Sequence, residues 1–258
     1  MKKATRSDLF GMAGKTALVT GGGGGLGRAI CRGFAEAGAR VVAADIALDL
    51  ANETADLVRD SGGSARADQL DVSSKEDVER VVREVLEEWK TIDVLVNAAG
   101  RAIRGSALDY SEQDFDTILN VNLKGTFFCC QVVGRHMAER RSGKIINIAS
   151  IGSMIAYAGS IAYLASKGGV AQLTRGFAVE LAPFNVQVNA IAPSLFETPM
   201  MAASRSDAES QRYFMDRTPM GRRGQPEEIV GAAIFLAANS SSMVTGHILA
   251  VDGGYLSA

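Results

Sequence analysis

The sequence predicts a single-domain α/β protein whose parallel sheet is doubly wound, with helices on both faces. Three observations predict this fold: short apolar runs recur along the chain, amphipathic stretches separate them, and a glycine run follows the first apolar segment. Continuous apolar runs of this length are typical of strands buried on both faces of a parallel sheet. Because no linker or repeat divides the 258 residues, residues 1–258 are expected to form one domain.

The strands are predicted from the apolar runs, and the helices from the segments between them. The expected strands are 16–20, 40–44, 94–96, 144–148, 187–191 and 248–251. The clearest helix carries one apolar stripe, made of Val78, Val81, Val82, Val85, Leu86 and Trp89. Ser73 and Glu76 have the spacing of a capping box at its start. Alternating strands and helices imply right-handed crossovers.

Composition excludes several classes of function. Lys and Arg total 27 against 29 Asp and Glu, a net charge of -2, so we expect neither nucleic acid nor a membrane surface as a partner. No apolar run approaches the ~18 residues of a membrane span, and the first fourteen residues lack the apolar core of a secretory signal. Two isolated histidines and three oddly spaced cysteines predict no metal site and a reducing, cytoplasmic environment.

A glycine run between the first predicted strand and the next helix predicts a phosphate-binding loop. Glycine permits the tight turn and lets the backbone approach a pyrophosphate, which the helix N-terminus then attracts. The segment Thr20-Gly-Gly-Gly-Gly-Gly-Leu-Gly27 satisfies two dinucleotide-binding frames, and Arg28-Ala29 after it excludes a P-loop. The alternative is a flexible glycine turn. The residues expected to contact the dinucleotide here are Gly21, Gly24, Gly25, Leu26 and Gly27.

Asp45 ends the second predicted strand, 18 residues beyond Gly27, close to the ~20 expected of an acid that binds the adenosine ribose. A carboxylate there repels a 2′-phosphate, and the next residue, Ile46, supplies no positive charge to bind one. These residues favour NAD over NADP. The alternative for Asp45 is a surface aspartate in a strand-end turn.

Tyr163 and Lys167 are spaced i, i+4 in a predicted helix over 160–181, which places phenol and ammonium on one face. A free phenol has a pKa of ~10, and a nearby ammonium favours its ionised form. Lowering that pKa to ~7 takes ~4 kcal/mol, more than one lysine readily supplies. A Tyr/Lys pair at this spacing is by itself usually an ordinary helix face.

An ordered series of motifs covers almost the whole chain: Thr20-Gly-x-x-x-Gly-x-Gly27, Asp71-Val72, Asn97-Ala-Ala-Gly100, Val121-Asn-Leu-Lys-Gly125, Ser150, Tyr163-x-x-x-Lys167, and Pro193 with Thr198. In this series the sequence resembles the short-chain dehydrogenase/reductase family. The resemblance implies a Rossmann-type fold and hydride transfer between a nicotinamide and a secondary alcohol or ketone. It also implies a homotetramer, built through helices over 112–138 and 160–181.

The resemblance assigns roles to four catalytic residues. Tyr163 is expected to be the general acid/base, and Lys167 to bind the nicotinamide ribose and lower the phenol pKa. Ser150 is expected to hydrogen-bond the substrate oxygen, and Asn122 to hold a water in a proton relay. From the residues alone, the alternative for Asn122 is a helix residue that bonds neighbouring backbone.

The resemblance also extends the cofactor site. Asp71 and Val72 are expected beside the adenine, although Asp71 is also a candidate cap for the next helix. The other expected contacts are Asn97, Ala98, Gly100, Pro193, Phe196 and Thr198. One departure is Ser194, where the family often has glycine.

Stretches such as Tyr163-Leu-Ala-Ser-Lys-Gly-Gly-Val170 and Phe196-Glu-Thr198 resemble, within the family, gluconate 5-dehydrogenases and related sugar-acid or polyol dehydrogenases. Arg101 and Arg104 are candidates to pair with a substrate carboxylate, or are solvated loop arginines. The alternative functions are a 3-oxoacyl-acyl-carrier-protein reductase and a non-catalytic dinucleotide sensor. The polar segment 194–217 predicts a substrate lid or a surface helix pair.

Overall fold

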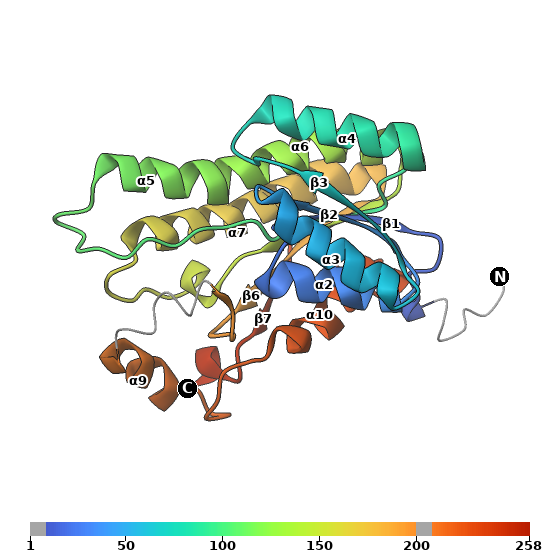
Figure 1. The fold of residues 1–258 in the computed structure, drawn as a ribbon. Coiled ribbons are helices and arrows are strands. Elements are labelled where there is room, and N and C mark those ends of the chain that lie inside the picture. The colour runs from blue at the N-terminus through green and yellow to red at the C-terminus, as the bar shows by residue number, and fades with distance from the viewer. Residues whose placement is uncertain (1–8, 200–207) are drawn as a thin grey trace.

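The computed structural model describes residues 9–199 and 208–258. Its centre is one sheet of seven parallel strands in the order β3-β2-β1-β4-β5-β6-β7 (Figure 1), which confirms the doubly wound prediction. The strands are β1 (Thr16–Thr20), β2 (Arg40–Asp45), β3 (Ser64–Gln69), β4 (Val94–Asn97), β5 (Gly143–Ile148), β6 (Val186–Pro193) and β7 (Ile248–Val251).

Helices cover both faces of this sheet. The α-helices are α2 (Gly25–Glu36), α3 (Leu48–Asp60), α4 (Lys75–Trp89), α5 (Glu112–Leu119), α6 (Thr126–Arg140), α7 (Ile161–Leu181), α9 (Ala208–Asp216) and α10 (Val230–Ala237). The short helical turns are η1 (Asn120–Gly125), η2 (Ile151–Ser153), η3 (Ala182–Phe184), η4 (Pro226–Ile229), η5 (Asn239–Ser241) and η6 (Tyr255–Ser257). The helix expected over 160–181 is confirmed as α7, and the segment 112–138 divides into α5, η1 and α6.

Two hydrophobic cores lie on opposite faces of the sheet. On one face α2 and α10 pack together, and Ile30 and Phe34 of α2 are fully buried there. On the other face α4 and α6 supply Val81 and Val133, which are also fully buried. In Figure 1, α4, α6 and α7 lie above the sheet while α2 and α10 lie below it. The strands between these layers need apolar residues on both faces, which explains their continuous apolar sequences.

The edge strand β3 is absent from the sequence prediction. It pairs in parallel with β2, from Arg40 opposite Ser64 to Asp45 opposite Gln69. Its sequence, Ser64-Ala-Arg-Ala-Asp-Gln69, is polar because an edge strand is only partly covered, so it has no apolar run to reveal it. Backbone pairing with β2, which only the folded chain provides, determines this strand.

The capping box predicted for α4 is wrong by one residue. The N-cap is Ser74, whose hydroxyl accepts a hydrogen bond from the Asp77 backbone N–H at 3.2 Å. Ser73 instead donates its hydroxyl to Asp71 at 2.7 Å, so Asp71 forms a turn before the helix and does not cap it. The valine stripe of α4 is buried as predicted.

The order of the strands reverses direction between β1 and β4, which lie side by side although two strands separate them in sequence. Their carboxyl ends meet where Thr20 is opposite Asn97. In doubly wound sheets this crevice is the place where ligands bind. Among the described helices, none is long and apolar enough to cross a membrane.

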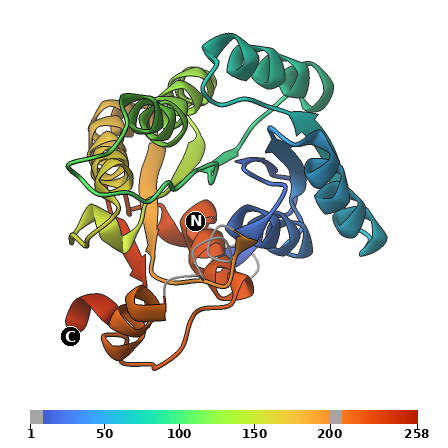
Figure 2. The same cartoon turned by 60° about the vertical axis from the view of Figure 1, so that its left-hand side comes forward.

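The predicted lid is described only in part, because residues 200–207 lie outside the described residues. Its helix α9 lies beside the C-terminal end of the chain in both views (Figures 1 and 2). The ring centroid of Phe214 in α9 lies 5.7 Å from that of Tyr255 and 5.0 Å from that of Tyr157. Aromatic contacts therefore join α9, the C-terminus and the loop before α7.

Candidate active site

A cavity of about 650 Å³ opens at the carboxyl ends of the strands. Most of the residues predicted for the site line it, and they come from six adjacent strands, β3 to β6 in the order of the sheet, and from the segments after them. The predicted residues that line it are Gly21, Gly24, Gly25, Leu26, Gly27, Asp45, Ile46, Asp71, Val72, Ala98, Gly100, Arg101, Ser150, Tyr163, Lys167, Pro193, Phe196 and Thr198. One cavity thus brings together the glycine loop, the acid after β2 and the Ser/Tyr/Lys group.

Three predicted residues do not line this cavity. Asn97 and Asn122 are buried behind it, and Arg104 lies exposed in the loop after β4. Arg101, three residues earlier, does line it. The two arginines are therefore not equivalent, although their sequence positions gave no way to separate them.

Sequence reasoning missed eight residues of the wall. They are Leu50, Leu70, Ala99, Val121, Ile148, Ala149, Ser194 and Pro199. Ala99 and Ala149 stand next to predicted site residues at strand ends, so their place in the wall could have been inferred from the sequence. Leu50 and Leu70 have no local signal, because they approach the cavity only when α3 and β3 pack beside β2.

The glycine loop is shaped by backbone contacts that exclude side chains. Gly21 has a φ of +66°, and a Cβ there would lie 2.7 Å from the Ala99 backbone. A Cβ on Gly27 would collide with the Gly21 carbonyl. Gly24 differs, because its φ is −167° and a Cβ would meet no protein atom within 4 Å. The backbone of Gly24 therefore faces the cavity, directly before the N-terminus of α2.

Asp45 is held by the backbone around it. Its Oδ2 accepts from the Gly23 N–H at 3.0 Å, and its Oδ1 accepts from the Ala47 N–H at 3.1 Å. A carboxylate has about four acceptor positions, so two remain for a ligand. Ile46 beside it is 64% exposed, so an apolar side chain follows the carboxylate at this edge of the cavity.

Ser150, Tyr163 and Lys167 come together where α7 packs on the end of β5. Ser150 follows β5 and accepts from the Gly152 N–H at 3.1 Å as the N-cap of η2. Ser150 and Tyr163 both line the cavity. The Lys167 Nζ lies 5.8 Å from the centroid of the Tyr163 ring. The i, i+4 spacing thus places the phenol and the ammonium on the face that meets Ser150.

Burial controls the ionisation of this group. Burial raises the pKa of the Tyr163 phenol above its ordinary value, while the hydrogen bond with Ser150 lowers it. Burial lowers the pKa of Lys167 to about 8, and its Nζ donates to the Ile148 carbonyl at 2.6 Å. With protein groups alone, Lys167 does not bring the phenol pKa below its usual range.

Asn122 lies in the π-helical turn η1 and hydrogen-bonds through both the oxygen and the nitrogen of its amide. The Oδ1 accepts from the Arg101 N–H at 2.8 Å. The Nδ2 donates to the Arg101 carbonyl at 2.9 Å and to the Ser166 hydroxyl at 3.0 Å. The side chain therefore anchors the loop after β4 against α7, the backbone-bonding alternative considered for this residue.

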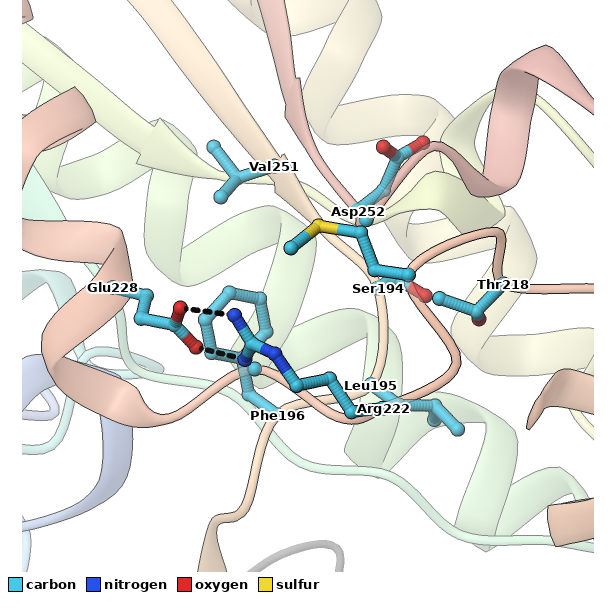
Figure 3. Close-up of a pocket in the computed structure, with 11 residues that line it drawn as sticks. Ser194, Leu195, Phe196, Thr218, Arg222, Glu228, Val251 and Asp252 are labelled. Carbon is cyan, nitrogen blue, oxygen red and sulfur yellow. Dashed lines mark hydrogen bonds and ion pairs between the residues drawn. The ribbon is translucent and has the colours of Figure 1, made fainter.

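A second, smaller cavity of about 90 Å³ lies on the other side of the segment after β6. Ser194 and Phe196 line both cavities. Figure 3 shows Arg222 pointing toward Glu228, with which it forms a bidentate ion pair. The Ser194 hydroxyl is buried and has no hydrogen-bond partner among the described residues.

The large cavity fits a nicotinamide dinucleotide. The backbone of the glycine loop lines the cavity at the N-terminus of α2. Free N–H groups at a helix N-terminus attract anions, so this part of the cavity suits a pyrophosphate. Asp45 ends β2, with Leu70 and Val72 also in the wall, as an adenosine requires. Ser150 stands after β5, three strands away from β2. The Asp45 carboxylate and the Ser150 hydroxyl therefore lie at separate parts of one site.

The comparisons with known proteins decide the family. The family model described as Enoyl-(Acyl carrier protein) reductase matches residues 22–256. The chain belongs to the short-chain dehydrogenase/reductase family. As a member of this family it is an oxidoreductase that uses a nicotinamide dinucleotide.

Relatives in the family match over nearly their whole length. The 2-dehydro-3-deoxy-D-gluconate 5-dehydrogenase of Bacillus subtilis strain 168 is 44% identical over 253 residues, 97% of this chain and 98% of that protein. The 5-keto-D-gluconate 5-reductase of Escherichia coli strain K12 is 40% identical over 250 residues, with the same two shares. The crystal structure of a gluconate 5-dehydrogenase from Burkholderia cenocepacia J2315, in complex with NADP and tartrate, has a TM-score of 0.94 and 40% identity, covering 98% of this chain and 100% of that one.

The glycine loop gives a prediction that separates ligand contact from folding. Gly24→Ala is expected to weaken NADH binding at least ~10-fold, because the added Cβ enters the cavity, while the melting temperature stays within ~1 °C. Gly21→Ala is the matched control. It places a Cβ against the Ala99 backbone at a positive φ, so it is expected to cost ~1–3 kcal/mol of stability. Fluorescence titration and thermal melting measure both, and unchanged NADH affinity in Gly24→Ala contradicts the prediction.

Proposed function

We propose that this protein is an NAD-dependent dehydrogenase that interconverts a secondary alcohol and a ketone of a sugar acid or polyol. The observation that carries the proposal is that Ser150, Tyr163 and Lys167 line the same cavity as the glycine loop. A proton-transfer group beside a dinucleotide site is what alcohol oxidation needs. The names of the relatives support a sugar acid, since all three act on gluconate or its keto derivatives.

Each residue of the group has a distinct task in this proposal. Hydride acceptance and donation are the chemistry that a bound nicotinamide supplies. The Tyr163 phenol takes the alcohol proton in oxidation and returns it in reduction. Ser150 hydrogen-bonds the substrate oxygen and Tyr163 together. Lys167 adds positive charge beside the phenol and holds the cofactor ribose, while Asn122 anchors the loop that carries Arg101.

The ionisation of Tyr163 makes the rates of the proposed oxidation and reduction depend on pH in opposite directions. Because burial raises its pKa, the phenol is protonated at neutral pH and is ready to donate to a ketone. Oxidation needs the phenolate, so its rate is expected to rise with pH until the phenol has ionised. Ketone reduction is expected to fall over the same range.

Two other functions remain as alternatives. A 3-oxoacyl-acyl-carrier-protein reductase shares the same proton-transfer group, and the description of the matching family model names an acyl carrier protein. A dinucleotide sensor needs the glycine loop but has no need of Ser150, Tyr163 and Lys167 together. A panel of sugar acids, polyols and acyl thioesters distinguishes the reductase from the proposed dehydrogenase. Turnover of any alcohol distinguishes the dehydrogenase from a sensor.

We expect the parent protein to reduce NAD with sugar acids or polyols, and not with 3-hydroxyacyl thioesters. Tyr163→Phe removes only the hydroxyl that carries the proton, so kcat is expected to fall ~10²–10⁴-fold with NADH affinity within threefold of the parent. Initial rates at 340 nm and NADH titration measure the two quantities. A Tyr163→Phe variant that turns over at the parent rate ends the proposal, and NADH binding without oxidation of any alcohol supports the sensor.

The preference for NAD rests on Asp45. Its carboxylate lines the cavity and keeps acceptor positions for ribose hydroxyls, whereas a 2′-phosphate there meets like charge. Ile46 supplies no cation to offset that charge. The Burkholderia cenocepacia relative was crystallised with NADP, so the choice between the two cofactors needs a direct test.

Asp45→Asn tests this preference. The amide keeps the shape of the side chain and removes the charge, so we expect kcat/KM for NADP to rise at least ~10-fold relative to that for NAD. Thermal melting checks that the contact with Gly23 still supports the loop. A parent enzyme that already prefers NADP by tenfold overturns the role given to Asp45.

The substrate carboxylate is assigned to Arg101 or Arg104. Arg101 lines the cavity. Burial raises the pKa of the Tyr157 phenol, and the positive charge of Arg104 offsets part of that rise, so Arg104 lies near Tyr157. The Tyr157 and Ser150 hydroxyls lie around one point beside Gly152, so we place Arg104 on the substrate side of the group. The guanidinium fork suits a carboxylate. This placement favours Arg104 over Arg101.

Arg104→Ala is expected to raise the KM for a sugar acid at least ~10-fold and to leave the KM for an uncharged polyol within twofold. Arg101→Ala run in parallel identifies which arginine binds the carboxylate. Steady-state kinetics with one sugar acid and one polyol of equal chain length give the comparison. If the KM for every sugar acid is unchanged in Arg104→Ala, this residue does not bind the carboxylate.

Three further expectations stay predictions. The segment 194–217 is proposed as a substrate lid, since Thr198 lies against Gly25 of the glycine loop. The homotetramer and the cytoplasmic location expected from the sequence are proposed with it.

A further inference from the structure

Tyr157 is a second phenol at the Ser150 hydroxyl. It stands in the loop between η2 and α7, where hydrogen bonding from the neighbouring Ser150 hydroxyl lowers its pKa against the larger, opposite effect of burial. A Cβ built on Gly152 would lie 3.2 Å from the Tyr157 hydroxyl and 3.4 Å from the Ser150 Oγ, so both oxygens surround one point. Neither the sequence motifs nor the site predicted from them included this residue.

The Tyr157 ring is fixed from the side away from Ser150. It packs edge-on against Phe214 of α9, with ring centroids 5.0 Å apart and an interplanar angle of 79°. Phe214 in turn contacts Tyr255 near the C-terminus. The partly buried residues Ile155 and Leu195 pack on the same cluster. The hydroxyl of Tyr157 is therefore presented to Ser150 by a ring with little freedom to turn.

The Ser150 hydroxyl has one hydrogen to donate and two lone pairs to accept with. One lone pair accepts from the Gly152 N–H at 3.1 Å. The hydroxyls of Tyr157 and Tyr163 are its other neighbours, and hydrogen bonding from Ser150 lowers the pKa of each phenol. Since it has a single hydrogen, it can donate to only one phenol at a time and can accept from the other.

The chemistry of the two phenols decides which of them donates to Ser150 and which accepts from it. Burial raises the pKa of Tyr157, which therefore keeps its proton and can always donate. Tyr163 has to alternate between phenol and phenolate in the proposed reaction, and only an accepted hydrogen bond stabilises the phenolate. The other titratable groups that act on Tyr157 are Arg104, Tyr163 and Tyr255.

We infer that Tyr157 is a positioning residue: it donates to Ser150, fills the second lone pair of that hydroxyl, and so turns its one hydrogen away from Tyr157, toward whichever of Tyr163 and the substrate oxygen accepts it at that stage of the reaction. This inference rests on the proposed function of the same site. A donor behind Ser150 also strengthens the hydrogen bond that Ser150 gives, because hydrogen bonds in a chain polarise one another. The oxygen of Tyr157 itself neither gains nor loses a proton during turnover.

The test measures the ionisation of Tyr163 directly. The chain has five tyrosines, so protein labelled with 13C at the tyrosine Cζ gives few NMR signals, and the one lost in Tyr163→Phe belongs to Tyr163. We expect Tyr157→Phe to raise the Tyr163 pKa by about one unit, with or without saturating NAD. Tyr255→Phe is the matched control, since it removes a hydroxyl from the same aromatic cluster, and it is expected to leave the Tyr163 pKa unchanged.

A double substitution shows whether Tyr157 acts through Ser150. In a Ser150→Ala background, Tyr157→Phe is expected to produce no further shift of the Tyr163 pKa. In the otherwise unchanged enzyme, Tyr157→Phe is expected to lower kcat about tenfold, to change KM less than threefold and to move the acid limb of the oxidation profile to higher pH.

The outcomes separate this inference from the proposed function. The titration needs no substrate, so it decides the role of Tyr157 even if no sugar acid is oxidised. An unchanged or lowered Tyr163 pKa in Tyr157→Phe overturns the inference, as does an equal shift in Tyr255→Phe or a further shift in the Ser150→Ala background. If Tyr157→Phe melts more than ~5 °C lower than the parent, the Tyr163 pKa is compared instead between Ser150→Ala and the double variant, at temperatures where the two are equally stable.

Discussion

A single buried ammonium sets the geometry of the site. Lys167 donates from α7 to the carbonyl of Ile148, the last residue of β5, at 2.6 Å. A buried charge without such a partner is costly, so helix and strand are held at this point. Tyr163 stands one helical turn before Lys167, and Ser150 stands two residues after Ile148. The distance between the two hydroxyl groups therefore follows from one contact between helix and sheet.

A buried chain of polar side chains repeats this constraint two turns further along α7. Asn147 of β5 donates to Thr174 at 2.9 Å and accepts from Asn97 of β4 at 2.8 Å, with Cys130 of α6 alongside. Because buried amides need partners, any slide of α7 along the sheet breaks these hydrogen bonds as well as the Lys167 contact. Asn97 thus supports the site from inside the sheet, without lining the cavity.

The aromatic cluster beyond Ser150 is built differently, from segments far apart in the chain. Tyr157 before α7, Phe214 in α9 and Tyr255 near the C-terminus meet through their rings. The glycine loop, by contrast, lies between β1 and α2, in a strand–turn–helix unit whose residues are close in sequence. The glycine loop thus rests on local structure, while the aromatic cluster depends on how distant segments pack.

The sequence by itself determined the parallel sheet, the glycine loop and the shared face of Tyr163 and Lys167, because apolar runs, glycine turns and i, i+4 spacing act within a few residues. Tertiary structure alone decided the edge strand β3, whose polar residues pair only once β2 is in place. It also placed Arg101 in the cavity and Arg104 beside Tyr157, and brought Tyr157 to Ser150. Such contacts join residues through packing between elements, which no local pattern of side chains encodes.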